Sequence, residues 1–354
     1  MAAARANGAQ ADDPRREGVL RAASDAAETD VVIVGAGPCG LAAAIAMKRV
    51  GLRAEIIERS CLVSGVYGYP TFMTFFSTAE RLAIGGVPFS VPGEKPTRRE
   101  ALAYYRTVTQ HFGLRVRQYE RVDEIVRTDA ARFRVHSTTT AGDRRITDAG
   151  AVVIATGYFG HPNRLGVPGE ELPHVTHLFK EGHEAFDRDA VVVGGGNSAV
   201  DAALDLYRAG ARATIVHFGA ELDRNVKPWV MPDIAGRIAE GSIGARFDAR
   251  VRAIEPRHVV VATPAGEERL AADHVYLMLG YQPNAWLLEQ LAVPIDPTTG
   301  IPHHDPATME TAVPGVFIAG VVASGYDANK TFIENGRHHG DLIAARLAGA
   351  YAPT

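Results

Sequence analysis

One pattern of about 30 residues occurs twice in this 354-residue chain. Residues 30–59 and residues 190–218 each begin with a run of β-branched residues and continue through a glycine-rich turn into an alanine-rich stretch. Each then ends in a second β-branched run. This order predicts a strand, a turn, a helix and a second strand, which is a βαβ unit. A chain with two such units is expected to fold as an α/β protein built on parallel sheets.

Glycines occupy the turn that opens each predicted helix. The first turn reads GAGPCG and has the spacing G-x-G-x-x-G, whereas the second reads GGGNSA, with alanine in the last position. Such glycines let the backbone approach a pyrophosphate, which then faces the free N–H groups at the helix N-terminus. Two complete units therefore predict two Rossmann-like dinucleotide-binding sites. The predicted contacts are Gly35, Gly37, Pro38 and Gly40 in the first unit, and Gly194, Gly196, Asn197, Ser198 and Ala199 in the second.

The residues that follow the second strand of each unit distinguish the two sites. Glu58 stands there in the first unit, and a carboxylate at this position accepts hydrogen bonds from ribose hydroxyls. The matching residue of the second unit is His217, and Arg224 and Lys227 follow it. Loss of the acid together with two cations favours a 2′-phosphate, so the second site is predicted to prefer NADPH to NADH. The alternative is that both cations are solvated loop charges.

Composition and charge exclude several classes of protein. The formal net charge of -4 gives no basic surface for nucleic acid. Two cysteines, Cys39 and Cys61, exclude a disulfide framework and suit a reducing cytoplasm. The uncharged stretch over residues 31–47 is interrupted by glycine and proline, so no membrane segment is predicted. No metal site is predicted, because the histidine pairs towards the C-terminus have no cysteine or carboxylate cluster to complete one.

Three further segments indicate how the chain is divided. Residues 151–157 are a predicted buried strand that ends in Ala-Thr-Gly, and residues 314–320 are another that ends in Ala-Gly. Between them, residues 273–284 close the second unit with Gly-Tyr-x-Pro. We therefore expect a second nucleotide domain inserted into a discontinuous first one. The predicted divisions are a disordered tail over 1–29, a first domain over 30–164 and 285–350, and a second domain over 165–284.

Together these motifs resemble those of the two-dinucleotide-binding-domain flavoprotein reductases, in the thioredoxin-reductase-like branch. The resemblance implies FAD in the first domain, NADPH in the second, and a homo-oligomer. Two features differ from that branch: the second domain has no C-x-x-C pair, and Val321 stands where many relatives have an aspartate. The FAD contacts that the resemblance adds to the glycine turn and Glu58 are Thr156, Gly157 and Gly320.

A closer resemblance is to the bacillithiol disulfide reductase family. It is carried by the segments GPCGLAAAI, YPTFMTFFSTAERLAIGGVPF, ALAYYR, VKPW and AGVVASGYDANKTFIENGRHHG. It implies an oxidoreductase that uses FAD and NADPH to reduce a small-molecule disulfide, oxidised bacillithiol. It also implies a characteristic cysteine in the first glycine turn, which here is Cys39.

Two interpretations of Cys39 remain open from the sequence. As a catalytic residue, it would form a mixed disulfide with one half of the oxidised thiol, which the reduced flavin would resolve. A helix N-terminus lowers the pKa of a thiol, whereas the anionic FAD pyrophosphate raises it, so the sequence leaves the ionisation of Cys39 undecided. As a structural residue, it would fill a small slot where strand and helix pack closely.

Two other functions also remain open. An NADPH–ferredoxin or flavodoxin reductase would not need Cys39, and a flavin-bearing redox sensor would use it to report oxidation. For a disulfide substrate that carries carboxylates, cationic and phenolic groups near the flavin are the expected ligands. The candidates are Tyr67, Tyr69, Tyr104 and Tyr105 in the first domain, with Tyr326, Lys330, Arg337 and His338 towards the C-terminus.

Overall fold

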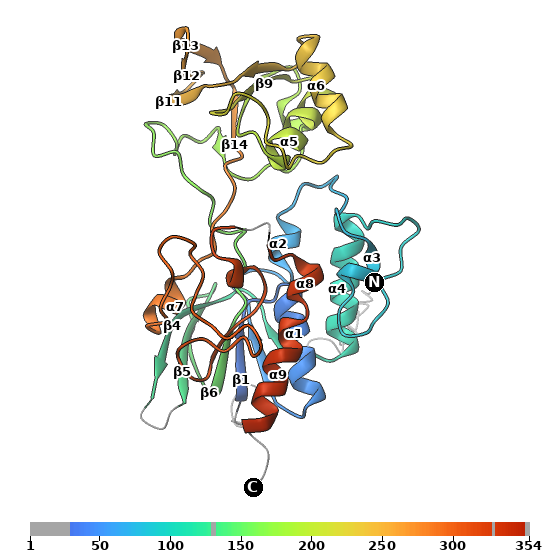
Figure 1. Cartoon of the computed structure of the whole chain (residues 1–354), viewed down its shortest axis with the longest axis vertical. Coiled ribbons are helices and arrows are strands. Elements are labelled where there is room, and N and C mark those ends of the chain that lie inside the picture. The colour runs from blue at the N-terminus through green and yellow to red at the C-terminus, as the bar shows by residue number, and fades with distance from the viewer. Residues whose placement is uncertain (1–28, 129–131, 328–329, 351–354) are drawn as a thin grey trace, which may run out of the picture.

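The computed structural model describes residues 29–128, 132–327 and 330–350, which form two lobes (Figure 1). The first repeat lies at the centre of the lower lobe. Its strands β1 (Thr29–Val34) and β2 (Ala54–Ile57) pair in parallel, and β1 also pairs in parallel with β6 (Arg144–Ile154). Residues 31–34 are buried, as expected of a parallel strand that is covered on both faces.

The sheet of the lower lobe has seven strands in the order β3-β2-β1-β6-β5-β4, with β15 paired to β6. The pairs β4–β5 and β5–β6 are antiparallel, whereas the other pairs, including those of β6 with β1 and β15, are parallel. Strand β15 returns the chain to this sheet after the second lobe, so the lower lobe is built from two separate stretches of sequence. The remaining strands are β3 (Val116–Arg117), β4 (Glu120–Arg127), β5 (Phe133–Thr139) and β15 (Val316–Ile318).

The first helix of the repeat is packed against the last helix of the chain. Helix α1 (Pro38–Arg49) is buried along residues 40–47. It lies beside α9 (His339–Ala350), where a Cβ atom on Gly340 would come within 2.5 Å of the Cα atom of Ala43 (Figure 1). The two ends of the described chain are therefore held together by close backbone packing.

Further helices surround this pair. Helix α4 (Arg98–His111) begins with a capping box, in which Thr97 accepts from the N–H of Glu100 and Glu100 accepts from the N–H of Thr97. The short helices are α2 (Ser64–Tyr67), α3 (Ala79–Leu82), α7 (Trp286–Gln290), α8 (Ile333–Gly336) and the 3₁₀ helix η3 (Gly320–Ser324).

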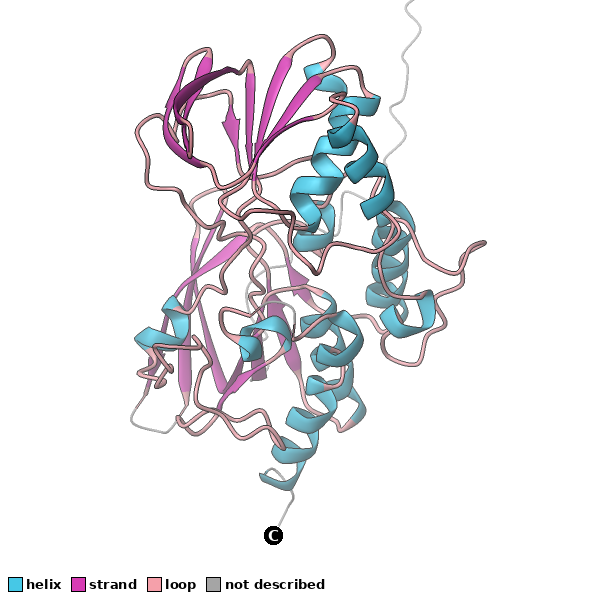
Figure 2. Cartoon of the chain, turned by 45° about the horizontal axis from the view of Figure 1, so that its top comes forward, coloured by secondary structure: helices cyan, strands magenta, loops and turns pink. Residues whose placement is uncertain are grey.

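The second repeat forms the centre of the upper lobe. Strand β8 (Asp189–Val193), helix α5 (Asn197–Arg208) and strand β9 (Arg212–Val216) follow one another in a parallel sheet of order β10-β9-β8-β14-β7. A separate antiparallel sheet, β11-β12-β13, shares a hydrophobic core with it (Figure 2). The remaining elements are β7 (Val175–Thr176), η2 (His183–Ala185), α6 (Met231–Ala239), β10 (Gly244–Arg246), β11 (Arg250–Glu255), β12 (His258–Thr263), β13 (Gly266–Ala271) and β14 (His274–Leu277).

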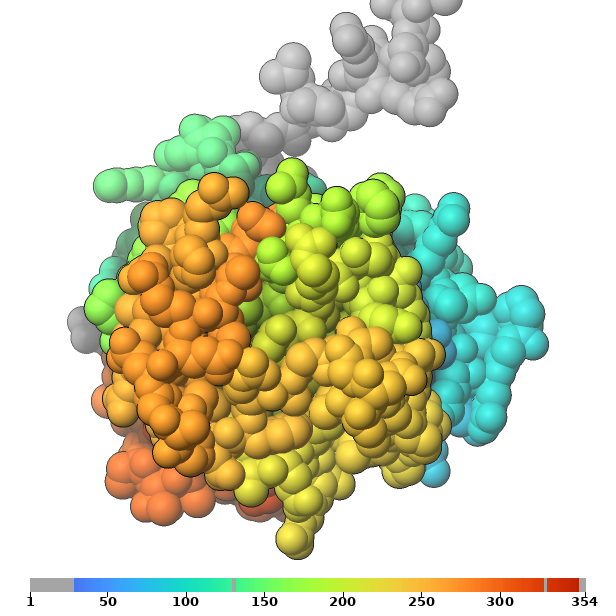
Figure 3. All heavy atoms as spheres, turned by 90° about the horizontal axis from the view of Figure 1, so that it is seen from above, coloured from blue at the N-terminus to red at the C-terminus, as the bar shows by residue number. Residues whose placement is uncertain are grey.

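Two stretches of chain cross between the lobes and pair with each other. The N–H of Asn163 donates to the carbonyl of Gly280 (3.0 Å), and the N–H of Gln282 donates to the carbonyl of His161 (2.9 Å). Seen from above, the second lobe fills the near face, and the segment around residues 80–100 projects beside it (Figure 3). The two lobes are therefore connected by two stretches of chain that are hydrogen-bonded to each other.

The predicted fold class, an α/β protein with two Rossmann-like units, is confirmed. The repeats predict neither the antiparallel strands β4 and β5 nor the sheet β11-β12-β13, because these lie outside both βαβ patterns. The predicted tail lies outside the described residues, apart from Thr29, with which β1 begins. The domain boundaries stay a prediction. Among the described residues, no helix is long and apolar enough to cross a membrane.

The glycine turn after β1 gives a test of this packing. A Cβ atom on Gly40 would overlap the carbonyl oxygen of Gly35, which is backbone and cannot move aside. We expect Gly40→Ala to lower the free energy of unfolding by about 3 kcal/mol, measured by urea unfolding. Gly349→Ala, also in a helix but with no atom within 4 Å of the added carbon, is the matched control and should be neutral or slightly stabilising. Equal losses in the two variants would contradict this account.

Candidate active site

A cavity of about 2460 Å³ lies between the lobes and is lined by residues of both. It is more than twice the size of a typical pocket for one small molecule, which is roughly 300–1,000 Å³. Seven of the eight predicted FAD contacts line it, as does Cys39, whereas Gly40 does not. These seven are Gly35, Gly37, Pro38, Glu58, Thr156, Gly157 and Gly320.

The first glycine turn is shaped to receive a group from the cavity. Gly35 has a φ of 110°, and a Cβ atom there would overlap the carbonyl of Ala155, so glycine is required. In contrast, a Cβ atom on Gly37 would meet nothing within 4 Å. The turn is therefore tight on its protein side and open on its cavity side, at the N-terminus of α1. This arrangement fits a dinucleotide pyrophosphate.

Glu58 holds the loop around this turn together. Its Oε2 atom accepts a hydrogen bond from the N–H of Ala36 (2.9 Å). Its Oε1 atom accepts from the N–H of Ser60 (2.9 Å) and from the hydroxyl of Ser64 (3.1 Å). The side chain is buried but lines the cavity, and each carboxylate oxygen can accept more than one hydrogen bond. Glu58 is thus positioned both to order the turn and to receive a ribose hydroxyl.

Two buried polar atoms of the cavity wall have no protein partner. They are the hydroxyl oxygen of Thr156 and the Nε2 atom of His161. Buried polar groups are normally hydrogen-bonded, so unsatisfied atoms in a cavity wall indicate a polar ligand or ordered water. Thr156 was predicted from the Ala-Thr-Gly motif. The role of His161 was not, because a lone histidine in a connector carries no spacing signal.

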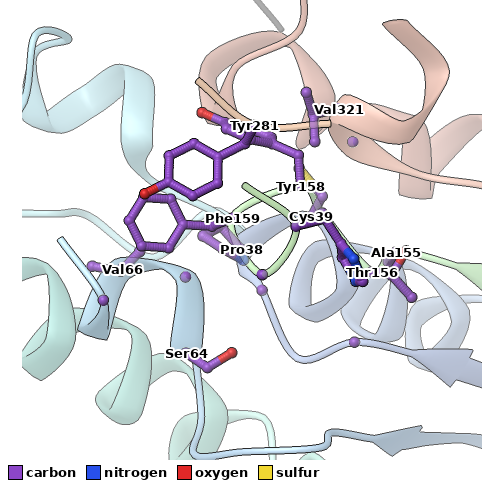
Figure 4. Close-up of a pocket in the computed structure, with 18 of the residues that line it drawn as sticks. Pro38, Cys39, Ser64, Val66, Ala155, Thr156, Tyr158, Phe159, Tyr281 and Val321 are labelled. Carbon is purple, nitrogen blue, oxygen red and sulfur yellow. The ribbon is translucent and has the colours of Figure 1, made fainter. Parts of the chain in front are cut away.

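Aromatic side chains form another part of the wall. The rings of Phe159 and Tyr281 are stacked with centroids 4.7 Å apart, and Tyr69 meets Phe159 edge-on at 5.0 Å. Figure 4 shows Tyr281 and Phe159 gathered on one side of Pro38 and Cys39. Of these rings, only Tyr69 was among the sequence candidates. Phe159 and Tyr281 come from the two crossing stretches, so only the tertiary structure brings them together.

Cys39 lines the cavity, and its thiol packs against the backbone of two glycines. It is the second residue of α1, and its Sγ atom lies 3.0 Å and 2.9 Å from the positions that Cβ atoms would take on Gly320 and Gly336. This burial raises the pKa of the Cys39 thiol to about 12. The free thiol is therefore protonated at neutral pH. The assignment of Cys39 as a catalytic residue stays a prediction.

The second glycine turn meets the same cavity from the other lobe. Asn197 and Ser198, at the start of α5, line the cavity, as does Lys227. Lys227 is paired with Asp201, with 2.7 Å between Nζ and Oδ2, and its N–H donates to Oδ1 of Asn197. Gly194, Gly196 and Ala199 form the turn behind them; Gly194 has a φ of 138°. The beginning of α5 thus faces the space in front of the first turn.

His217 and Arg224 lie away from this cavity wall. His217 is 3% exposed, and its ring lies where Cβ atoms on Gly195 and Gly219 would stand. Its Nε2 atom is 3.5 Å from Oδ1 of Asp223. The side chain of Arg224 is 95% exposed, with Glu221 3.8 Å away. The two cations predicted to bind a 2′-phosphate, Arg224 and Lys227, are therefore not gathered at one point, and the predicted NADPH contact His217 is buried.

The remaining sequence candidates divide between the cavity and structural contacts. The hydroxyls of Tyr104 and Tyr105 donate to backbone carbonyls, and Arg337 donates to the carbonyls of Glu80 and Ala83. Gly320 donates its N–H to Nδ1 of His339 (3.2 Å), a half-buried histidine whose pKa is lowered to about 4, mainly by desolvation. Of the eight proposed substrate ligands, only Tyr69 lines the cavity.

The fold and the shared cavity define an oxidoreductase with two dinucleotide-binding units. Residues 32–320 match the family model of the pyridine nucleotide-disulphide oxidoreductases. The chain is 45% identical over 320 residues to the bacilliredoxin reductase Bdr of Bacillus subtilis, covering 90% of this chain and 97% of that protein. The chain belongs to the bacillithiol disulfide reductase family, whose members are flavoprotein disulfide reductases.

Solved structures agree with this assignment. The bacillithiol disulfide reductase Bdr (YpdA) from Bacillus cereus superposes with a TM-score of 0.89 at 44% identity, over 91% of this chain and 99% of that one. Thioredoxin reductase from T. acidophilum shares the fold alone, with a TM-score of 0.68 at 22% identity over 92% and 99%. The resemblance seen in the sequence is therefore confirmed. The family implies FAD and a nicotinamide dinucleotide, which fits the open glycine turn and the unsatisfied hydroxyl of Thr156.

The burial of Cys39 can be tested by alkylation with iodoacetamide in a Cys61→Ser variant, where Cys39 is the sole thiol. With a pKa of about 12, about one molecule in 10⁴ is a thiolate at pH 8, against roughly a quarter of free cysteine. We expect alkylation at pH 8 at least about a hundredfold slower than that of free cysteine, and still rising at pH 10. A rate that levels off below pH 9 would contradict the raised pKa. The Cys39→Ser variant, which keeps only Cys61, serves as the comparison.

Proposed function

We propose that this chain uses NADPH to reduce the disulfide of a low-molecular-weight thiol, with oxidised bacillithiol as the substrate. The reaction consumes one NADPH, one proton and one disulfide, and it yields NADP⁺ and two thiols. The observation that carries this proposal is the single thiol, Cys39, on the wall of a cavity that both nucleotide units share. The relationship to bacillithiol disulfide reductases supports the choice of substrate.

The residues of the first unit would hold FAD. Gly37 leaves room for the pyrophosphate, the N-terminus of α1 faces it, and Glu58 receives a ribose hydroxyl. The unsatisfied hydroxyl of Thr156 is a further polar contact. When bound, FAD supplies a two-electron carrier between the nicotinamide and the disulfide.

The second unit would present the nicotinamide nucleotide to the same cavity. Asn197 and Ser198 offer the N-terminus of α5 to its pyrophosphate. Lys227 is held by Asp201, so its charge is already neutralised on the cavity side. A preference for NADPH over NADH must therefore come from residues other than Lys227 and Asp201.

Cys39 would act as the attacking thiol. Its Sγ atom forms a bond to one sulfur of the substrate, the substrate disulfide breaks, and the thiol proton passes to the departing sulfur. Two electrons and two protons, which correspond to the hydride of NADPH and the one proton consumed, then release the second half of the substrate as a thiol and restore the Cys39 thiol. Because burial keeps Cys39 protonated, attack requires that proton transfer to accompany bond formation. Tyr69 and Tyr105 lie near Cys39. Burial raises the pKa of both phenols, and a thiolate at Cys39 would raise them further.

Substitution of the two cysteines tests this function. We expect Cys39→Ala to abolish NADPH oxidation that depends on oxidised bacillithiol, while NADPH still bleaches the bound flavin, because only the thiol step is removed. Cys61→Ala is the matched control and should keep the wild-type rate, since Cys61 does not line the cavity. The rates are followed by NADPH absorbance in stopped-flow and steady-state assays.

Assays with other electron acceptors distinguish a disulfide reductase from a reductase of electron-carrier proteins. The same assay is run with a ferredoxin and with dioxygen alone. Turnover with ferredoxin only would replace the disulfide reductase by an electron-carrier reductase, and a wild-type rate in Cys39→Ala would remove the thiol from the mechanism. The homo-oligomer and the cytoplasmic location stay predictions.

A further inference from the structure

The residue that the structure places best for binding the 2′-phosphate of the nucleotide differs from the two that the sequence predicts. We propose that Arg250 binds this phosphate, with Phe218 holding its guanidinium in place. The inference rests on the proposed use of NADPH and names the residue that selects it over NADH. It concerns the end of β9, where a Rossmann unit places the adenosine ribose.

His217 cannot fill this role, because its ring is turned inward. It is the first residue after β9 and lies beneath the glycine turn, where Cβ atoms on Gly195 and Gly219 would stand. With 3% of its surface exposed, it offers no edge to a nucleotide. The histidine thus supports the turn from below.

Phe218 and Arg250 occupy the outer surface at the same point. The side chain of Phe218 is 63% exposed. The guanidinium carbon of Arg250 lies 5.3 Å from the centre of its ring, within the range of a cation–π contact. Among the described residues, no carboxylate forms an ion pair with Arg250. Its N–H groups are therefore oriented by the ring and free to bind an anion in bidentate geometry.

Backbone pairing fixes Arg250 beside the end of β9. The N–H of Ala249 donates to the carbonyl of His217 (2.9 Å), and the N–H of Asp248 donates to the carbonyl of Gly219 (2.9 Å). Arg250, the first residue of β11, follows directly. A residue distant in sequence is thereby placed at the ribose position of the Rossmann unit.

The two cations predicted from the sequence are less suited to this role. Lys227 is paired with Asp201 and faces the cavity between the lobes, where the nicotinamide half of the nucleotide would lie. Arg224 is 95% exposed, and among the described residues its one ion pair is with Glu221, 3.8 Å away. An unrestrained side chain loses more conformational entropy on binding.

Asp223 provides the competing possibility. Its Oδ2 atom lies 3.2 Å from the position of a Cβ atom on Gly196, so its carboxylate borders the glycine turn. Such an acid could accept ribose hydroxyls and favour NADH. Its Oδ1 atom lies 3.5 Å from Nε2 of His217, whereas the guanidinium of Arg250 is held by the ring of Phe218.

Binding of nucleotide fragments tests the inference without turnover. Isothermal titration calorimetry on the purified flavin-containing protein compares 2′,5′-ADP with 5′-AMP, which differ only in the 2′-phosphate. We expect the wild type to prefer 2′,5′-ADP by roughly tenfold to a hundredfold, as for a charge-assisted bidentate contact. Arg250→Gln should lose most of that preference and keep its affinity for 5′-AMP. Phe218→Leu should lose part of it, because the guanidinium is less well held.

Two further variants complete the design. Arg252→Gln removes an exposed arginine of the same strand and should bind both fragments as the wild type does. Arg224→Gln tests the sequence-based prediction. If Arg224→Gln loses the preference and Arg250→Gln keeps it, the assignment to Arg250 is overturned while NADPH use stands. If the wild type binds both fragments equally, or prefers 5′-AMP, the proposed use of NADPH fails and the inference fails with it.

Discussion

The close approach of backbone at the turn after β1 is the constraint on which the rest of the site depends. Gly35 lies against the carbonyl of Ala155, and Gly40 lies against the carbonyl of Gly35, with no room for a side chain at either position. This packing brings the N-terminus of α1 to the edge of the sheet and leaves Gly37 open to the cavity. Glu58 then locks the loop by accepting hydrogen bonds from the N–H groups of Ala36 and Ser60.

The same packing determines the chemistry open to Cys39. Gly320 and Gly336 belong to segments far along the chain, and both press their backbone against its thiol. A helix N-terminus alone would make the thiol more acidic, but the loss of solvent acts in the opposite direction and raises its pKa. Cys39 is therefore a thiol of raised pKa on the wall of the cavity that we propose holds FAD.

Local patterns in the sequence were sufficient for much of the fold and for the position of the two glycine turns. The two βαβ units, the glycine turns and Glu58 could be predicted because their residues are close in sequence and their spacing has one physical meaning. The stacked pair of Phe159 and Tyr281 could not, since its members lie on separate crossing stretches of chain. The ion pair of Lys227 with Asp201 could not be predicted either, because the sequence around a lysine in a loop does not indicate which carboxylate it will contact.

The sequence by itself determined the class of fold, the two nucleotide units and the family, because these depend on periodicity and on short motifs read along the chain. The tertiary structure alone decided which groups share a surface. It enclosed the Cys39 thiol between two distant glycines and set Arg250 over Phe218 at the end of β9. Burial and charge pairing arise from contacts between segments far apart in sequence, and for that reason no local pattern can specify them.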